Sequence, residues 1–125
     1  MIYNNGEYKI RFYYDQKTKS EPVFFFICVL PDRFRAKIFK YLTYLKSHEG
    51  IWEFPYTSHV DGKIRELRID FGRNRYRILY FIFVKRNIIL LHVFRKNTAK
   101  IPGKELRIAE NRYIEVLNNS HFYTQ

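Results

Sequence analysis

Arginines are concentrated in the part of the chain whose pattern predicts successive β-strands. Residues 64–100 read as three strands, and the first two carry Arg65, Arg68, Arg73, Arg75 and Arg77. Because alternate side chains of a strand point to opposite faces of a sheet, some of these cations must share one face. Such a face attracts a polyanion, since a planar guanidinium group can hold two oxygens of one phosphate.

The composition of the chain supports this interpretation. Its 125 residues include 23 Lys and Arg against 12 Asp and Glu, which gives a net charge of +11. Too few acids are present to neutralise the cations by ion pairing, so the balance favours a nucleic acid, an anionic membrane or an acidic protein as partner. A hydrophobic content of 46%, with 12 Phe and 11 Tyr, is enough for one folded domain over residues 1–125.

The remaining reactive residues exclude several other classes of protein. Cys28 is the one cysteine and lies in an apolar run, so no internal disulfide can form and a catalytic thiol is disfavoured. That run, residues 23–30, is too short to cross a bilayer and has no cleavage site typical of a signal peptide, so we expect a cytoplasmic protein. The histidines and acids of residues 48–61 have no recognised metal-ligand spacing, and we expect neither a metal nor a cofactor.

Hydrophobic periodicity predicts the elements that must position the cations. Alternation predicts a strand over 8–14, and helical spacing predicts helices over 23–29, from about 34 to 47, and from 102 onward. We expect a loop over 51–61, strands over 64–70, 74–84 and 88–94, and a flexible polar tail over 118–125. The strand over 74–84 is apolar on both faces in its later part, which predicts a central strand covered on each side.

The order of these elements predicts an α+β domain with two layers. It reads β-α-α-β-β-β-α, with a mostly antiparallel four-stranded sheet packed against the two N-terminal helices. Within the strands, Arg75 and Arg77 share one parity, as do Glu66 with Arg68, and His92 with Lys96. These side chains can therefore converge on one surface if the strand faces agree.

Several short motifs, in their order and spacing, resemble the RelE/ParE toxin superfamily. Within it they resemble the HigB-like toxins of the phage-derived group. The resemblance covers about residues 8–117 and implies a RelE-like fold. The motifs are Glu21-Pro22-Val23, Glu66-Leu67-Arg68, Arg77-Ile78-Leu79-Tyr80, Leu90-Leu91-His92 with Phe94, Lys96 and Thr98, and Lys100 followed by Pro102, Glu105 and Ala109.

The resemblance implies the toxin of a type II toxin–antitoxin system. Such a toxin is a metal-independent endoribonuclease that cuts mRNA in the ribosomal A site, and its partner is a helix-turn-helix antitoxin of HigA type. The 2′-OH of the RNA attacks the neighbouring phosphate, and fixed cations stabilise the charge that develops on the phosphoryl oxygens. The family's basic residues fall on Arg68, Arg77 and Lys96.

The general acid and base remain open among several residues. An arginine keeps its proton, whereas a lysine among other cations can lose one, so Lys96 is a candidate, with His92 and Lys100 as others. The sequence departs from the family pattern at Arg65, where many relatives have an aromatic residue, and at Asn97, where many have a second basic residue. We expect RNA contacts from Arg65, Arg73, Arg75, Arg95 and Lys100.

Alternative interpretations exist for both the protein and its residues. The same fold is used by ParE-like gyrase poisons, and the chain could also be a non-catalytic RNA-binding module. Arg68 and Arg77 could form ordinary ion pairs with Glu66, Asp70 or Asp61, and His92 could be a hydrogen-bonded core histidine. Phe71, beside the arginines, is the aromatic residue that the sequence favours for stacking on a base.

Overall fold

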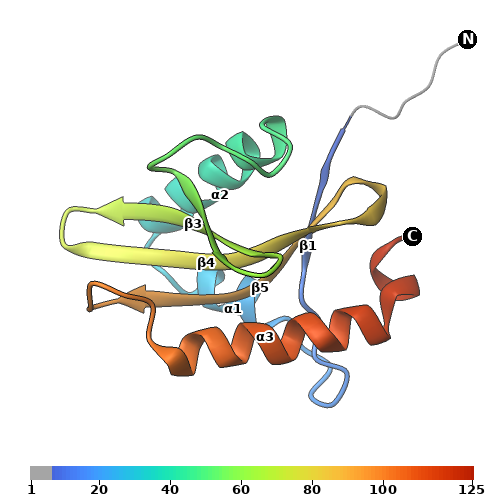
Figure 1. Cartoon of the computed structure of the whole chain (residues 1–125). Helices are drawn as coiled ribbons and strands as arrows, with labels where there is room; N and C mark the ends of the chain where they lie inside the picture. Colours follow the sequence, from blue (N-terminus) through green and yellow to red (C-terminus); the bar gives the residue numbers. More distant parts are fainter. Residues whose placement is uncertain (1–6) are drawn as a thin grey trace, which may run out of the picture.

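The fold is built from one sheet and three α-helices. A computed structural model describes residues 7–125, and Figure 1 shows the arrangement. The sheet has the spatial order β1-β5-β4-β3-β2, in which β1 runs parallel to β5 and all other neighbours are antiparallel. The elements are β1 (Lys9–Phe12), α1 (Pro22–Cys28), α2 (Asp32–Ser47), β2 (Thr57–Asp61), β3 (Ile64–Phe71), β4 (Asn74–Phe83), β5 (Asn87–Lys96) and α3 (Gly103–Asn118), with short 3-10 turns at Val84–Arg86 and Ser120–Tyr123.

Helices cover both faces of the sheet. On one face α1 and α2 contribute Ile27 and Ile38 to a core that includes Leu67 of β3. On the other face α3 contributes Ala109 and packs against a second core that includes Leu79 of β4. Figure 1 shows α3 on the opposite side of the sheet from α1 and α2. The central strands are therefore buried on both sides, as the apolar pattern of 74–84 predicts.

The prediction of two layers and four strands is wrong, although the α+β class is confirmed. The domain has three layers, because the apolar stripe of α3 packs on the face that the first two helices leave uncovered. The stripe residues Ala109 and Val116 are fully buried there. A strand that is apolar on both faces already requires a second covering layer, and α3 is the element that supplies it.

The predicted loop over 51–61 ends in a strand that the sequence analysis missed. Thr57–Asp61 pairs with β3 as the edge strand β2, in the register Thr57 to Leu67 and His59 to Arg65. An edge strand needs only one neighbour, and this one is short and polar. Its sequence therefore lacks the apolar alternation that marks a strand covered by a helix.

The end of α2 depends on a glycine that lies against the sheet. Gly50 has φ +85°, and a Cβ built on it would lie 2.7 Å from Cδ1 of Ile82. Its carbonyl oxygen accepts a 2.6 Å hydrogen bond from the hydroxyl of Tyr80. Both the left-handed conformation and the close approach require glycine here. The helix α1 begins at Pro22, with Glu21 as its N-cap residue.

The C-terminal residues pack on the start of the sheet. Tyr123 lies in the turn Ser120–Tyr123 and is 2% exposed. Its hydroxyl accepts a 2.8 Å hydrogen bond from the backbone N–H of Tyr14, just after β1. The segment expected to be a polar tail thus contributes a buried ring to the second core. Within residues 7–125, no helix combines the length and apolar character needed to cross a membrane.

Candidate functional site

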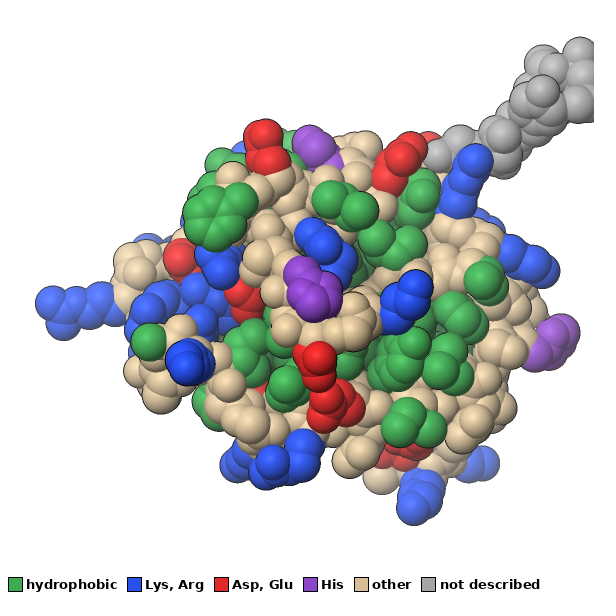
Figure 2. Space-filling view, viewed as in Figure 1, with side chains coloured by type: hydrophobic (Ala, Val, Ile, Leu, Met, Phe, Trp, Pro, Cys, Tyr) green, Lys and Arg blue, Asp and Glu red, His purple; other side chains and the backbone are tan. Residues whose placement is uncertain are grey.

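The register of three strands brings the predicted cations together. Arg68 of β3 lies opposite Arg77 of β4, and Arg75 of β4 lies opposite Lys96 of β5. Residues directly opposite each other in an antiparallel pair project from the same face. The face is that of Leu79 and Phe94, which belong to the apolar core that α3 covers. Figure 2 shows cationic side chains gathered at the left, where Figure 1 places the β3–β4 turn.

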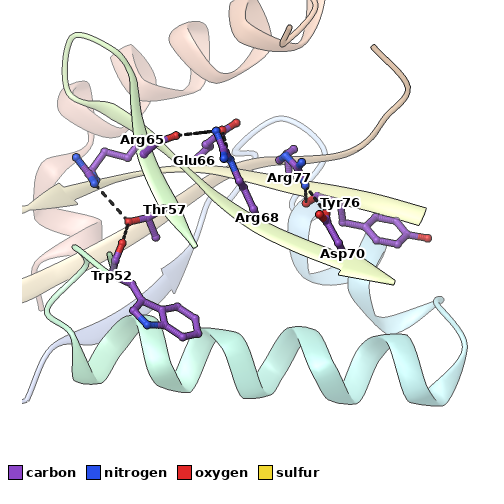
Figure 3. Close-up of polar contacts among 9 residues, drawn as sticks. Trp52, Thr57, Arg65, Glu66, Arg68, Asp70, Tyr76 and Arg77 are labelled. Carbon is purple, nitrogen blue, oxygen red and sulfur yellow. Dashed lines mark hydrogen bonds and ion pairs between the residues drawn. The ribbon is translucent and has the colours of Figure 1, made fainter. Parts of the chain in front are cut away.

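Arg68 is held by neighbours on its own face. Its Nε donates a 2.8 Å hydrogen bond to Oε1 of Glu66, and its Nη2 donates a 3.3 Å bond to the hydroxyl of Ser58. Glu66 is buried, whereas the Arg68 side chain keeps 28% of its surface exposed. Figure 3 shows the contact between Arg68 and Glu66. The carboxylate therefore fixes the direction of the guanidinium group while leaving part of it open to a ligand.

Arg77 lies deeper than Arg68. Its Nη1 donates to Oδ1 of Asp70 at 2.7 Å and to the carbonyl of Tyr76 at 2.9 Å (Figure 3). Its side chain is 6% exposed, but that of Asp70 is 50% exposed. Two atoms nearby, Nε of Arg77 and Oε2 of Glu66, are buried without a hydrogen-bond partner among residues 7–125. Buried polar atoms are usually satisfied, so this site has unused capacity for a polar ligand or water.

Lys96 is the third cation and lacks a carboxylate at ion-pair distance within residues 7–125. It is 9% exposed. Burial lowers the pKa of Lys96 below its usual 10.5; Glu66 acts in the opposite direction, and the nearby arginines Arg77, Arg68 and Arg75 lower it further. A lysine with a lowered pKa can give up its proton more readily, which is what a general base requires.

A hollow lies at the open end of the cationic face. It has a volume of about 350 Å³, and its lining includes Arg68, Asp70 and Arg77 together with Lys37 and Tyr56. Lys37 comes from α2 and donates a hydrogen bond of 2.5 Å to the carbonyl of Asp70. The hollow therefore joins the exposed part of β3 to α2, and its size falls within the range of small-ligand sites.

His92 shares the face with Lys96 but is fully engaged with protein groups. Its Nε2 lies 2.7 Å from Oε1 of Glu105, and Nη1 of Arg112 lies 3.4 Å from its Nδ1. Because arginine can only donate, Nδ1 is the acceptor and Nε2 carries the proton. Burial lowers the pKa of His92, with Glu105 acting in the opposite direction. The arrangement is that of a neutral histidine that fastens the first turn of α3 to β5.

The other predicted RNA-binding residues divide between the two faces of the sheet. Arg75 lies on the cationic face, and Arg73 is exposed at the β3–β4 turn. Arg65 lies on the opposite face, where it donates to the hydroxyls of Tyr80 and Thr57 at 3.3 and 3.4 Å. Arg95 lies opposite Tyr76, whose ring packs against the first two helices. Lys100 is exposed in the loop before α3. The structure thus brings only part of the predicted set together.

The aromatic residue at the site is not the one that the sequence favours. Phe71 stacks on Phe34 at 4.2 Å between ring centroids and is covered by Lys37, so its ring is occupied. Phe54, in the loop after α2, is 74% exposed, and Cζ of Arg68 lies 5.1 Å from its ring centroid. The sequence contains no periodic signal for Phe54, because its position depends on how the loop folds.

These side chains can bind and stabilise a phosphoryl group. Arg68, Arg77 and Lys96 supply positive charge from three strands, and Glu66 and Asp70 orient the two arginines. Within residues 7–125, no group of three or more His, Cys, Asp and Glu residues lies close enough to hold a metal ion. The described cations offer electrostatic stabilisation of a phosphoryl group, and Lys96 offers proton transfer.

A comparison with family models identifies the relatives of this chain. The model described as "Phage derived protein Gp49-like (DUF891)" matches residues 26–114. The chain belongs to the Gp49-like family. This family is of the RelE/HigB toxin type, which agrees with the superfamily resemblance drawn from the motifs. The matched region of the Gp49-like chain contains Arg68, Arg77, Lys96 and Phe54. No curated protein matched the chain in a separate search.

Proposed function

We propose that this Gp49-like protein is the toxin of a type II toxin–antitoxin system and cleaves mRNA on the ribosome. The observation that carries the proposal is the convergence of Arg68, Arg77 and Lys96, from three strands, on one sheet face, where the side chain of Arg68 is partly exposed. Family membership supports the toxin class. The HigB assignment within that class remains part of the proposal.

The proposed reaction uses the RNA as its own nucleophile. The 2′-oxygen attacks the adjacent phosphorus, the bond from phosphorus to the 5′-oxygen breaks, and the products are a 2′,3′-cyclic phosphate and a free 5′-OH. Arg68 and Arg77 stabilise the negative charge on the equatorial oxygens. Lys96, in its neutral form, takes the proton of the 2′-OH, and its lowered pKa favours that form.

The carboxylates beside the arginines are compatible with this role. Asp70 is half exposed, so its ion pair with Arg77 is partly solvated and a phosphate can compete for the guanidinium group. Glu66 is buried and holds Arg68 in place, which reduces the reorganisation needed when RNA arrives. With four cations (Arg68, Arg75, Arg77 and Lys96) against two carboxylates, the face keeps an excess of positive charge.

His92 has a positioning role in this proposal rather than a proton-transfer role. Both of its ring nitrogens contact protein groups, and the partly buried ring lies between β5 and α3. The general acid for the 5′-oxygen is then protonated Lys96 after it has taken the first proton. Lys100, exposed in the adjacent loop, is the other candidate.

A partner with excess acidic residues is also part of the proposal. The net charge of +11 is large for 125 residues, and an acidic helix-turn-helix antitoxin of HigA type would offset it. By covering the cationic face it would also exclude RNA. Binding of the antitoxin should therefore weaken with added salt, since the attraction between exposed charges is screened.

The test is a translation reaction programmed with one defined mRNA. We expect the purified protein to cut the mRNA only when ribosomes are present, and to leave a 2′,3′-cyclic phosphate. An mRNA with a single 2′-deoxynucleotide at the mapped position should resist cleavage there. Intact mRNA together with double-stranded DNA breaks in expressing cells would instead support a gyrase poison and overturn the proposal.

A further inference from the structure

An aromatic ring is held in solvent at the edge of the cationic face. Phe54 is 74% exposed, although it is a large apolar side chain. It lies in the loop between α2 and β2, over the guanidinium group of Arg68 at 5.1 Å from ring centroid to Cζ. Exposing an aromatic ring forfeits the free energy of burying it, so this position calls for an explanation.

The loop that carries Phe54 is fixed at both ends. Trp52 is 8% exposed and stacks on Tyr56 at 4.1 Å with an interplanar angle of 11°. The carbonyl of Tyr56 accepts a 2.9 Å hydrogen bond from the N–H of Arg68, and the hydroxyl of Thr57 donates to the carbonyl of Trp52. Figure 3 shows the Trp52–Thr57 contact beside the site. The ring of Phe54 is thus presented by an anchored turn.

Phe54 borders the hollow that contains the proposed catalytic arginines. Pro55 and Tyr56, the next two residues, line that hollow of about 350 Å³ together with Arg68 and Arg77. Lys37 lines the same hollow from the side of α2. A flat exposed ring, an adjacent guanidinium group and a concave basic surface are the parts from which sites for single-stranded nucleic acid are built.

We propose that Phe54, backed by Arg68, stacks on one base of a single-stranded RNA next to the scissile phosphate. This inference rests on the proposed function for the identity of the ligand and adds a binding residue to it. The stack would hold the RNA strand so that the next phosphate meets Arg68 and Arg77. Because every base has a π face, Phe54 would supply affinity and position with little sequence preference.

The test measures binding without cleavage. The probe is a short RNA with 2-aminopurine beside the cleavage position and a 2′-deoxynucleotide at that position, used alone and within ribosome-bound mRNA. We expect Phe54→Ala to weaken binding by about five- to a hundredfold, as loss of one stacked base does. Phe54→Trp should keep the affinity and the quenching of 2-aminopurine, whereas Phe54→Leu, which keeps an apolar side chain without a ring, should lose the quenching.

A matched control and a second readout keep the outcomes distinct. Phe25 is 67% exposed on α1, on the far side of the sheet, so Phe25→Ala should bind RNA like the wild type.

Wild-type affinity and quenching in Phe54→Ala would overturn the stacking proposal even if the protein cleaves mRNA. Failure of the wild type to bind either probe would overturn it as well. RNA binding that depends on Phe54, without any cleavage, would instead leave the stacking site in place and refute the ribonuclease. Loss of antitoxin binding alone in Phe54→Ala would mark Phe54 as a protein contact and overturn the RNA assignment.

Discussion

The two ends of one sheet face have opposite characters. Near the β4–β5 turn Leu79, Phe81 and Ile89 of this face belong to the apolar core covered by α3. Toward the β3–β4 turn the same face carries Arg68, Arg77 and Lys96, of which Arg68 stays partly exposed. The helix α3 determines where the apolar core ends and the candidate site begins. The hydrogen bond between His92 of β5 and Glu105 in the first turn of α3 marks this boundary.

The candidate site therefore depends on α3 covering only part of this sheet face. The strands continue past the apolar core under α3, and there the Arg68 side chain is 28% exposed whereas Arg77 and Lys96 are nearly buried. Substitutions at the covered end should therefore change stability, and substitutions at the open end should change activity. Four predictions test that division, beginning with the largest expected effect.

Truncating a buried side chain under α3 should lower the stability of the protein. Leu79 is fully buried beneath α3, so Leu79→Ala leaves a cavity and should lower the free energy of unfolding by about 3–5 kcal/mol. Chemical denaturation measures this directly. Cleavage by the fraction that remains folded should stay near wild type. A strong loss of activity without a loss of stability would contradict the division between the two ends.

Substitution of a cation near the β3–β4 turn should lower the rate of mRNA cleavage. Arg77→Ala removes a cation from the face where charge develops and should slow mRNA cleavage about a hundredfold or more, as removal of an oxyanion-hole donor does. Arg77→Lys should recover only part of the rate, because it keeps the charge and loses the planar fork. Arg107→Ala removes an exposed arginine of α3 and serves as the control of equal charge, with a rate near wild type. Equal rates in all three variants would refute the assigned site.

Replacing Lys96 should raise the stability of the protein and abolish its cleavage activity. Burial lowers its pKa, so protonation of the folded protein costs free energy between that lowered pKa and the usual 10.5. Stability of the wild type should therefore rise with pH across this window. Lys96→Met should be more stable than the wild type near neutral pH by about 1 kcal/mol, the low end of the gain when buried charges are replaced by apolar groups, and should not cleave. A destabilised Lys96→Met that melts below the wild type would contradict this account.

The boundary histidine should produce the smallest effect. Burial lowers the pKa of His92 below its usual 6.5, so the unfolded chain takes up this proton more readily than the folded protein does. The stability due to neutral His92 is present above pH 6.5 and is lost as the pH falls toward the lowered folded-state pKa. Melting temperatures of the wild type and His92→Gln should therefore converge on acidification. A constant difference between them from neutral to acidic pH would show that His92 does not titrate in this way.

Much of the fold could be predicted because periodicity reports burial. The amphipathic helix α2 and the doubly apolar strand β4 follow directly from the spacing of their apolar residues. The third layer was missed because the apolar stripe of α3 predicts that this helix packs against the sheet, but does not predict which face of the sheet it covers. The strand β2 was missed because a polar edge strand resembles a loop in sequence.

The site divides in the same way between local and distant determinants. The parity of Arg68 and Arg77 could be read along each strand, and the register confirms that they share a face. Arg65 and Arg95 were grouped with them although their parity places them on the other face. Phe54 was missed because its exposure follows from the stacking of Trp52 on Tyr56, which no spacing in the sequence encodes.

The contact between Tyr123 and Tyr14 has a consequence for local unfolding of the protein. β1 is a four-residue edge strand, and the buried ring of Tyr123 lies against the segment that follows it. Trimming the last six residues by carboxypeptidase would uncover that segment and remove its hydrogen bond. Amide protons of β1 and of Tyr14 should then exchange faster with deuterium, while those of β4 stay protected, so loss of the C-terminal residues would first destabilise the segment around β1.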